Sequence, residues 1–183
     1  MKITKDFSGL VENDYYFEFQ GDITSEAEIE IDLPKWLKVS GSLIAKTFIK
    51  ARSGIEAGSG IEAGWGIEAG EGIEAGWGIE AGWGIEAGWG IKAGSGIEAG
   101  SGIEAGWGIE AGEGIEAGEG IEAGEGIEAG LSIRCKKVLK FKFNLFAGIA
   151  CWKKAEGEDL IVEAKRIEGE VKYGVKRILE NGE

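Results

Sequence analysis

The side-chain carboxylates of this 183-residue chain are its most numerous and most regularly spaced candidate reactive groups. Twelve glutamates recur between residues 56 and 128 at intervals of six or, once, twelve residues. Pairs of carboxylates perform general acid–base catalysis when different environments separate their pKa values. Here every glutamate has almost the same neighbours in sequence, so that difference is not expected. The chain also contains no His, which removes the usual general base and the imidazole ligands of metal sites.

Other reactive groups point to no site. Cys135 and Cys151 lack the spacing of a metal site and are too few for a disulfide framework, so we expect two buried thiols. The glycine-rich tract lacks both the Lys-Ser/Thr ending of a phosphate loop and the strand-to-helix context of a dinucleotide site. We therefore expect no enzyme, no cofactor and no metal.

A repeat positions the glutamates. Thirteen consecutive copies of x-Gly-Ile-Glu-Ala-Gly fill residues 53–130. In a strand, Ile and Ala point to one side and the charge between them to the other. We expect the two glycines to form corners. Apart from Lys92, which replaces Glu in one copy, only x varies. The x positions hold Ser53, Ser59, Trp65, Glu71, Trp77, Trp83, Trp89, Ser95, Ser101, Trp107, Glu113, Glu119 and Glu125.

This repeat predicts an all-β fold, a parallel β-solenoid with about 18 residues per coil, in which each strand stacks on the equivalent strand of the next coil. The inward pattern continues outside the perfect copies, as in Leu43 and Ala45 before them and Ile133 and Cys135 after them. We expect six to seven coils. The predicted organisation is an N-terminal cap at 1–30, a solenoid at 31–148 and a mainly β C-terminal cap at 149–183.

The two caps are expected to cover the open strand edges at the ends of the solenoid. Apolar and β-branched runs predict strands at residues 15–20 and 27–33 in the first cap. In the second cap they predict strands at 159–164 and 167–175 and a short helix at 177–181.

The tract resembles the hexapeptide-repeat parallel β-helix proteins, a left-handed β-helix-like solenoid family, because Ile-Glu fits the aliphatic and acidic positions of their repeat. Near-identical repeats of this kind are similar to those of phage and mobile-element proteins. The family has a small residue where nine of the thirteen copies here have Trp or Glu, so we expect Ala to be the small inward residue instead. Many members are acyltransferases with a His base, and a related branch binds zinc through His; no position here can take those roles. Ice-binding solenoids are similar in architecture but present ranks of Thr, which the repeat tract lacks.

The net charge of −13 is unevenly distributed. Residues 53–130 hold sixteen Glu and one Lys, whereas the basic collar, residues 131–154, holds seven Lys or Arg and no acid. Three hexads per coil predict three outward ladders. They are Glu56, Glu74, Lys92, Glu110 and Glu128; Glu62, Glu80, Glu98 and Glu116; and Glu68, Glu86, Glu104 and Glu122.

Two interpretations of the ladders are open. The first is that glutamate keeps a Gly- and Ile-rich rod soluble and monomeric through self-repulsion. The second starts from the charge density, since three carboxylates per coil of about 4.8 Å approach the one charge per roughly 1.7 Å of duplex DNA. A basic protein built to bind nucleic acid could then bind this rod instead.

The repeat tryptophans are also open to two interpretations. The same coil length predicts that Trp65 stacks on Trp83 and Trp89 on Trp107, with Trp77 alone. Exposed Trp is common at binding hot spots and can stack on Arg. Stacked Trp can equally shield the corners and help the coils pack.

The leading hypothesis is a non-enzymatic, acidic binding protein that mimics nucleic acid and inhibits a basic nucleic-acid-binding protein, as phage anti-CRISPR proteins do by analogy. The twelve ladder glutamates and the five repeat tryptophans would contact that partner, and the rod would not bind nucleic acid itself. The alternative is a structural or self-assembling scaffold, with the collar meeting the acidic rod of a second molecule. We interpret the collar as the solvated face of terminal strands, although it could also bind nucleic acid. Without a signal peptide or a membrane-length apolar run, we expect a cytoplasmic protein.

Overall fold

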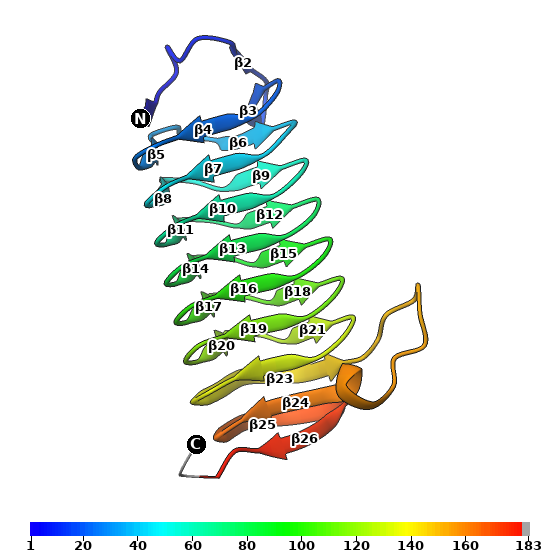
Figure 1. The fold of residues 1–183 in the computed structure, drawn as a ribbon. Helices are drawn as coiled ribbons and strands as arrows, with labels where there is room; N and C mark the ends of the chain where they lie inside the picture. Colours follow the sequence, from blue (N-terminus) through cyan, green and yellow to red (C-terminus); the bar gives the residue numbers. More distant parts are fainter. Residues whose placement is uncertain (181–183) are drawn as a thin grey trace.

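The computed structural model describes residues 1–180 and shows a parallel β-solenoid of about nine coils (Figure 1). The only helical element in this range is a short 3-10 helix, η1 (Gly157–Leu160). The predicted coil length is confirmed by the strand registers: Ile61 of β10 (Ile61–Ala63) lies beside Ile79 of β13 (Ile79–Ala81). The all-β prediction is likewise confirmed.

The strands of the perfect repeats form three faces. Face 1 contains β9 (Ile55–Ala57), β12 (Ile73–Ala75), β15 (Ile91–Ala93), β18 (Ile109–Ala111) and β21 (Ile127–Ala129). Face 2 contains β10, β13, β16 (Ile97–Ala99) and β19 (Ile115–Ala117). Face 3 contains β11 (Ile67–Ala69), β14 (Ile85–Ala87), β17 (Ile103–Ala105) and β20 (Ile121–Ala123).

Isoleucine and alanine fill the interior of the solenoid. In the thirteen perfect copies each Ile is at most 1% exposed and each Ala at most 7% exposed. Burial of an aliphatic side chain of this size contributes roughly 1.5–3 kcal/mol, so the repeated Ile provides most of the core. The prediction that Ala is the small inward residue is confirmed.

Both glycines of the repeat lie at the corners between strands, as expected, but they have different roles. No repeat glycine adopts a positive φ. A Cβ on Gly100, which follows Ala, would lie 1.9 Å from the carbonyl oxygen of Gly82 in the preceding coil. A Cβ on Gly102, which precedes Ile, would lie 3.5 Å from the oxygen of Gly120, an ordinary contact. Close stacking of coils therefore requires the glycine that follows Ala, while the glycine that precedes Ile keeps the outer surface open.

Parallel stacking extends beyond residues 31–148 at the N-terminal end. β3 (Tyr16–Phe19) pairs with β6 (Trp36–Val39), β4 (Ile23–Ser25) with β7 (Leu43–Ala45), and β5 (Ile29–Ile31) with β8 (Ile49–Ala51). The strands expected at 15–20 and 27–33 correspond to β3 and β5.

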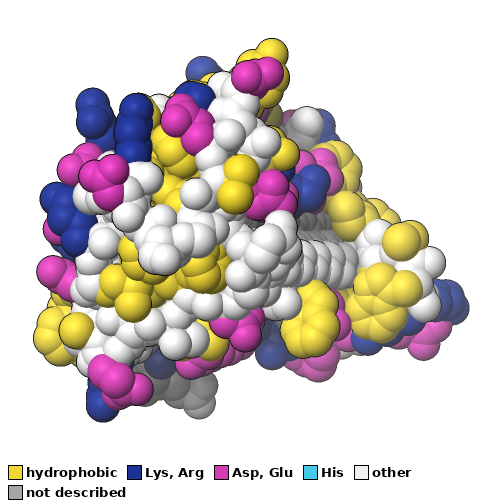
Figure 2. Space-filling view, turned by 90° about the horizontal axis from the view of Figure 1, so that it is seen from above, with side chains coloured by type: hydrophobic (Ala, Val, Ile, Leu, Met, Phe, Trp, Pro, Cys, Tyr) yellow, Lys and Arg dark blue, Asp and Glu magenta, His cyan; other side chains and the backbone are white. Residues whose placement is uncertain are grey.

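Residues 1–12 lie across the N-terminal end. β1 (Lys2–Ile3) pairs with β5, and β2 (Leu10–Glu12) forms an antiparallel hairpin with β3. Ile3 is buried, and Phe7 and Leu10 pack against the core. Viewed from this end, acidic and basic side chains are interspersed around the rim (Figure 2).

Stacking also continues at the C-terminal end. β22 (Ile133–Cys135) pairs with β24 (Ile161–Ala164), β23 (Val138–Ala147) with β25 (Arg166–Tyr173), and β24 with β26 (Val175–Ile178), all in parallel. These strands add a further coil below the collar (Figure 1). Together with the N-terminal strands they explain why there are about nine coils and not the six to seven expected.

The helix expected at 177–181 is wrong where the structure describes it. Arg177 and Ile178 belong to β26, because this segment pairs with β24 and completes the last coil. Asn181 lies outside the described residues. The strand expected at 167–175 is divided at Gly174, whose φ of 125° turns the chain from β25 into β26. Residues 159 and 160, expected in a strand, belong to η1.

Candidate binding surfaces

The three charged ladders lie in register as predicted. On face 2, Glu62, Glu80, Glu98 and Glu116 are direct neighbours across successive strands. The same holds on face 3 for Glu68, Glu86, Glu104 and Glu122, and on face 1 for Glu56, Glu74, Lys92, Glu110 and Glu128. The structure thus brings twelve predicted site residues together as three outward rows.

Lysines pair with half of the glutamates in the ladders on faces 1 and 3. On face 1 the Nζ of Lys38 lies 2.6 Å from a carboxylate oxygen of Glu56, and Lys92 lies 2.7 Å from Glu110. Hydrogen bonds to these carboxylates raise the pKa of both lysines above the usual value. At neutral pH each therefore remains a charged partner of its ladder.

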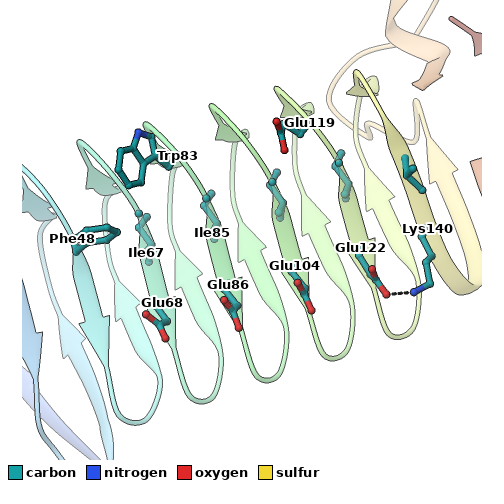
Figure 3. A pocket seen from close by; sticks show the side chains of 17 residues that line it. Phe48, Ile67, Glu68, Trp83, Ile85, Glu86, Glu104, Glu119, Glu122 and Lys140 are labelled. Carbon is teal, nitrogen blue, oxygen red and sulfur yellow. Dashed lines mark hydrogen bonds and ion pairs between the residues drawn. The ribbon is translucent and has the colours of Figure 1, made fainter. Parts of the chain in front are cut away.

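Face 3 carries a lysine at each end of its acidic row. Lys50 lies 3.1 Å from Glu68, and Lys140 forms an ion pair with Glu122 (Figure 3). The predicted ladders did not include Lys38, Lys50 and Lys140. Each lies one coil length from a ladder glutamate in the sequence, which is the signal that could have found them.

The ladder on face 2 has no cationic partner. Within residues 1–180, none of its four glutamates forms an ion pair or a side-chain hydrogen bond. Arg134 follows Glu116 in register, but its guanidinium lies 2.7 Å from Glu158 instead. Face 2 therefore presents four neighbouring unpaired carboxylates.

The predicted tryptophan stacks are confirmed. The rings of Trp65 and Trp83 are parallel within 5° and 5.3 Å apart, and those of Trp89 and Trp107 within 4° and 5.2 Å apart. The five repeat tryptophans are 41–69% exposed. In each stacked pair the two rings pack against each other and remain partly exposed to solvent.

Two aromatic residues outside the perfect repeat join these pairs, and the sequence analysis did not identify them. Phe48 lies edge-on to Trp65 at 5.3 Å and to Trp83 at 6.0 Å. Trp36 lies 6.5 Å from Trp89 and donates its indole N–H to the Glu71 carboxylate at 2.5 Å. Both precede an inward residue, the position that glycine takes in the repeat.

A glycine-floored groove runs along each face, between the x corner and the glutamate ladder. The face 3 groove has a volume of about 430 Å³, with Trp83 and Glu119 on one side and the glutamate row on the other (Figure 3). The face 2 groove, of about 460 Å³, is lined by Trp77, by the glycines from Gly60 to Gly114 and by the four unpaired glutamates. Trp36, Trp89, Trp107 and Lys92 line the face 1 groove.

Most cations of the collar have acidic neighbours. Lys137 lies 2.8 Å from Glu119, Lys153 lies 2.9 Å from Asp159, and Lys154 lies 2.6 Å from Glu156. Arg134 and Lys140 are paired as described above. This arrangement favours the interpretation of the collar as a solvated face over that of a nucleic-acid site.

The cysteines occupy different environments. Cys135 is buried in the inward alanine position, and burial raises the pKa of its thiol to about 11. Cys151 is exposed, so the expectation of two buried thiols is wrong for it, because residues 148–156 leave the coil as a surface loop. Among residues 1–180 no three His, Cys, Asp or Glu side chains are grouped as metal ligands. No helix in the described part of the chain could span a membrane.

Replacing the five repeat tryptophans together with serine is expected to leave the fold intact. Serine already occupies x in four copies, and the x backbone bonds to the next coil whatever its side chain, as in Ser95 N–H to Trp77 O at 2.8 Å. Two lost stacks should lower the free energy of unfolding by about 1–3 kcal/mol in total. Circular dichroism and thermal melting test this, with Trp77→Ser as the control that removes no stack. Loss of the β spectrum would make the tryptophans structural.

A comparison of the chain with models of protein families, with curated proteins and with solved structures found no match.

Proposed function

We propose that this is a non-enzymatic binding protein whose acidic coils occupy the nucleic-acid-binding surface of a basic partner protein. The observation that carries the proposal is the set of three in-register glutamate ladders on one rod. Each coil is hydrogen-bonded to the next through strands and corners alike, as in Ile91 N–H to Gly108 O at 3.0 Å. The backbone positions that carry the carboxylates are thus fixed before a partner arrives, which lowers the entropic cost of binding.

The charge density remains close to that of DNA after the ion pairs are taken into account. Four of the twelve ladder glutamates pair with lysine, which leaves eight. Spread over four coils of about 4.8 Å, eight carboxylates give one charge per roughly 2.4 Å of axis. Duplex DNA has one per about 1.7 Å, so a basic groove would release a comparable number of counterions on binding this rod.

The resemblance of the repeat to phage and mobile-element repeats suggests the first partner to test. A nucleic-acid-guided defence complex has the required basic channel, and its occupation would inhibit nucleic-acid binding in the manner of an anti-CRISPR protein. The proposal places this encounter in the cytoplasm, where such complexes act.

The test is capture of purified nucleic-acid-guided nuclease by the immobilised native protein and by a variant with all twelve ladder glutamates changed to glutamine. The native protein should retain the nuclease until the salt concentration is raised, and duplex DNA should compete. Loss of twelve charges should weaken capture by at least about 100-fold. Equal capture by the two proteins would refute the proposal, and circular dichroism of the glutamine variant is the control for folding.

A scaffold is the second candidate, because the last coil has free strand edges. Within residues 1–180, β25 and β26 each pair with another strand on one side only. Val175 and Ile178 are 51% and 56% exposed there. Lys176 occupies the inward column below Val162, and an inward charge opposes pairing with a further strand. Sedimentation at increasing concentration distinguishes the candidates, since a scaffold would grow and a binding protein would keep its mass.

A further inference from the structure

The three grooves differ in how much of their charge is free. Lys92 interrupts the ladder of face 1, and Lys50 and Lys140 pair with both ends of the ladder of face 3. Among residues 1–180, none of the four carboxylates of face 2 has an ion-pair partner. Since neighbouring like charges destabilise a sheet, a cation bound in the face 2 groove would relieve a repulsion that the chain itself relieves only on the other faces.

The grooves also differ in how open their floors are. On face 3 the Phe48 ring lies over Gly66, where an added Cβ would meet it at 3.1 Å. On face 1 the Trp36 ring covers Gly54 and Gly72 in the same way. Face 2 has the small residue Ser42 at the equivalent position, and Ser132 at the other end. Its glycine floor is therefore open along its length.

The face 2 groove contains the most exposed of the repeat tryptophans. Trp77 is 69% exposed and lies in the corner column between Ser59 and Ser95, to which its backbone is hydrogen-bonded. It makes no aromatic pair within residues 1–180, unlike the other four. Its exposed ring is consequently available to a ligand.

We infer that the face 2 groove binds an extended, arginine-rich segment of the partner protein. A guanidinium group can stack on an indole and donate to a carboxylate at once, whereas an ammonium group is a more strongly hydrated point charge. From Ser42 to Ser132 the groove spans five coil spacings, about 24 Å, which an extended peptide of about seven residues fills. This inference rests on the proposed function and names the contact face and the chemistry of the ligand.

The first test uses fluorescent nona-arginine as the probe and the full chain, with binding measured by anisotropy. Glu98 and Glu104 lie in one coil, on faces 2 and 3. The substitutions Glu98→Lys and Glu104→Lys change the net charge equally, and each introduces the residue that Lys92 already provides at this repeat position in the same coil. Glu98→Lys should weaken binding by about tenfold, whereas Glu104→Lys, on face 3, should weaken it by less than about threefold. Equal losses, or a larger loss for Glu104→Lys, would overturn the assignment to face 2.

A second pair of variants tests the groove without changing charge. Gly96→Leu fills the floor of the face 2 groove, and Gly102→Leu does the same on face 3; an added Cβ meets only ordinary contacts at either position, at 3.4 and 3.5 Å. We expect about a tenfold loss of nona-arginine binding for Gly96→Leu and no change for Gly102→Leu. Binding that is insensitive to both would show that the peptide does not enter a groove.

A third measurement tests the role of Trp77. The native protein should bind nona-arginine about fivefold more tightly than nona-lysine, and Trp77→Ser should remove that preference while Trp107→Ser keeps it. A preference that survives Trp77→Ser would overturn the role given to this ring.

The groove and the proposed function can fail separately. If nona-arginine binds in the face 2 groove but capture of the nuclease is unchanged in the glutamine variant, the assignment of the groove is supported and the proposed function is refuted. If capture depends on the glutamates but nona-arginine binding is spread over all faces, the proposed function is supported and the assignment to the face 2 groove is refuted.

Discussion

Changing Gly100 to alanine is expected to lower the free energy of unfolding by about 3 kcal/mol, at the upper end of the usual cost of overpacking. The added Cβ would lie 1.9 Å from the carbonyl oxygen of Gly82 and 2.9 Å from its carbonyl carbon. Both are backbone atoms of the preceding coil and cannot rotate away. The coils would have to separate locally, which would also weaken the Gly100 N–H to Ala81 O hydrogen bond of 3.0 Å.

Gly102→Ala is the matched control, two residues away in the same coil. Its Cβ has an ordinary contact, and the φ of Gly102 is not positive, so alanine fits the native backbone. By restricting the unfolded chain, it should leave stability unchanged or raise it by up to about 1 kcal/mol. Urea denaturation followed by circular dichroism measures both variants. A similar loss of stability in the two variants would mean that the glycines are needed for backbone conformational freedom and not for the close spacing of the coils.

Changing the four glutamates of face 2 to glutamine is expected to stabilise the protein. Glu62, Glu80, Glu98 and Glu116 form three like-charge contacts and no ion pair in residues 1–180. Relief of three such contacts should raise the free energy of unfolding by about 1–2 kcal/mol at low salt. For a chain of this length the melting temperature should rise by about 3–6 °C.

The control removes the same charge from glutamates that have lysine partners. Glu56, Glu68, Glu110 and Glu122, changed together to glutamine, lose four ion pairs as well as four like-charge contacts. This variant should show no gain in melting temperature. In 1 M salt the difference in melting temperature between each variant and the native protein should be smaller, because the Debye length there is about 3 Å. An equal rise in the two variants would show that only net charge matters, and that the unpaired state of face 2 has no energetic consequence.

The stability and binding predictions concern the same four glutamates. Face 2 combines unrelieved repulsion, an open glycine floor and an exposed indole. A rod that needed only solubility could carry lysines in this ladder as it does in the other two. We propose that a cationic ligand neutralises the four carboxylates beside Trp77, and the variants described above test this proposal.

The repeat was sufficient to predict the all-β solenoid, its coil of three hexads, the inward Ile and Ala, and the pairing of Trp65 with Trp83 and of Trp89 with Trp107. The reason is that the hexad period determines which residues point inward, and the common triangular coil of three hexads aligns every third copy. All twelve ladder glutamates follow from the same register. Outside the perfect copies the period weakens, which is why the strands of the last coil were assigned to a separate cap and β26 in part to a helix.

Which charges are free and which glycines are required depends on contacts that form only in the folded chain. Arg134 lies one coil after Glu116, so the register alone would pair it with the face 2 ladder. Its guanidinium instead forms an ion pair with Glu158 of η1. Phe48 and Trp36 lie over glycines of the following coils, so two grooves are partly covered and one is open. Both glycines of each copy look alike in sequence, yet only one faces a carbonyl oxygen of the preceding coil. Periodicity determines backbone register, whereas side-chain partners depend on non-repeated residues whose positions the folded chain alone defines.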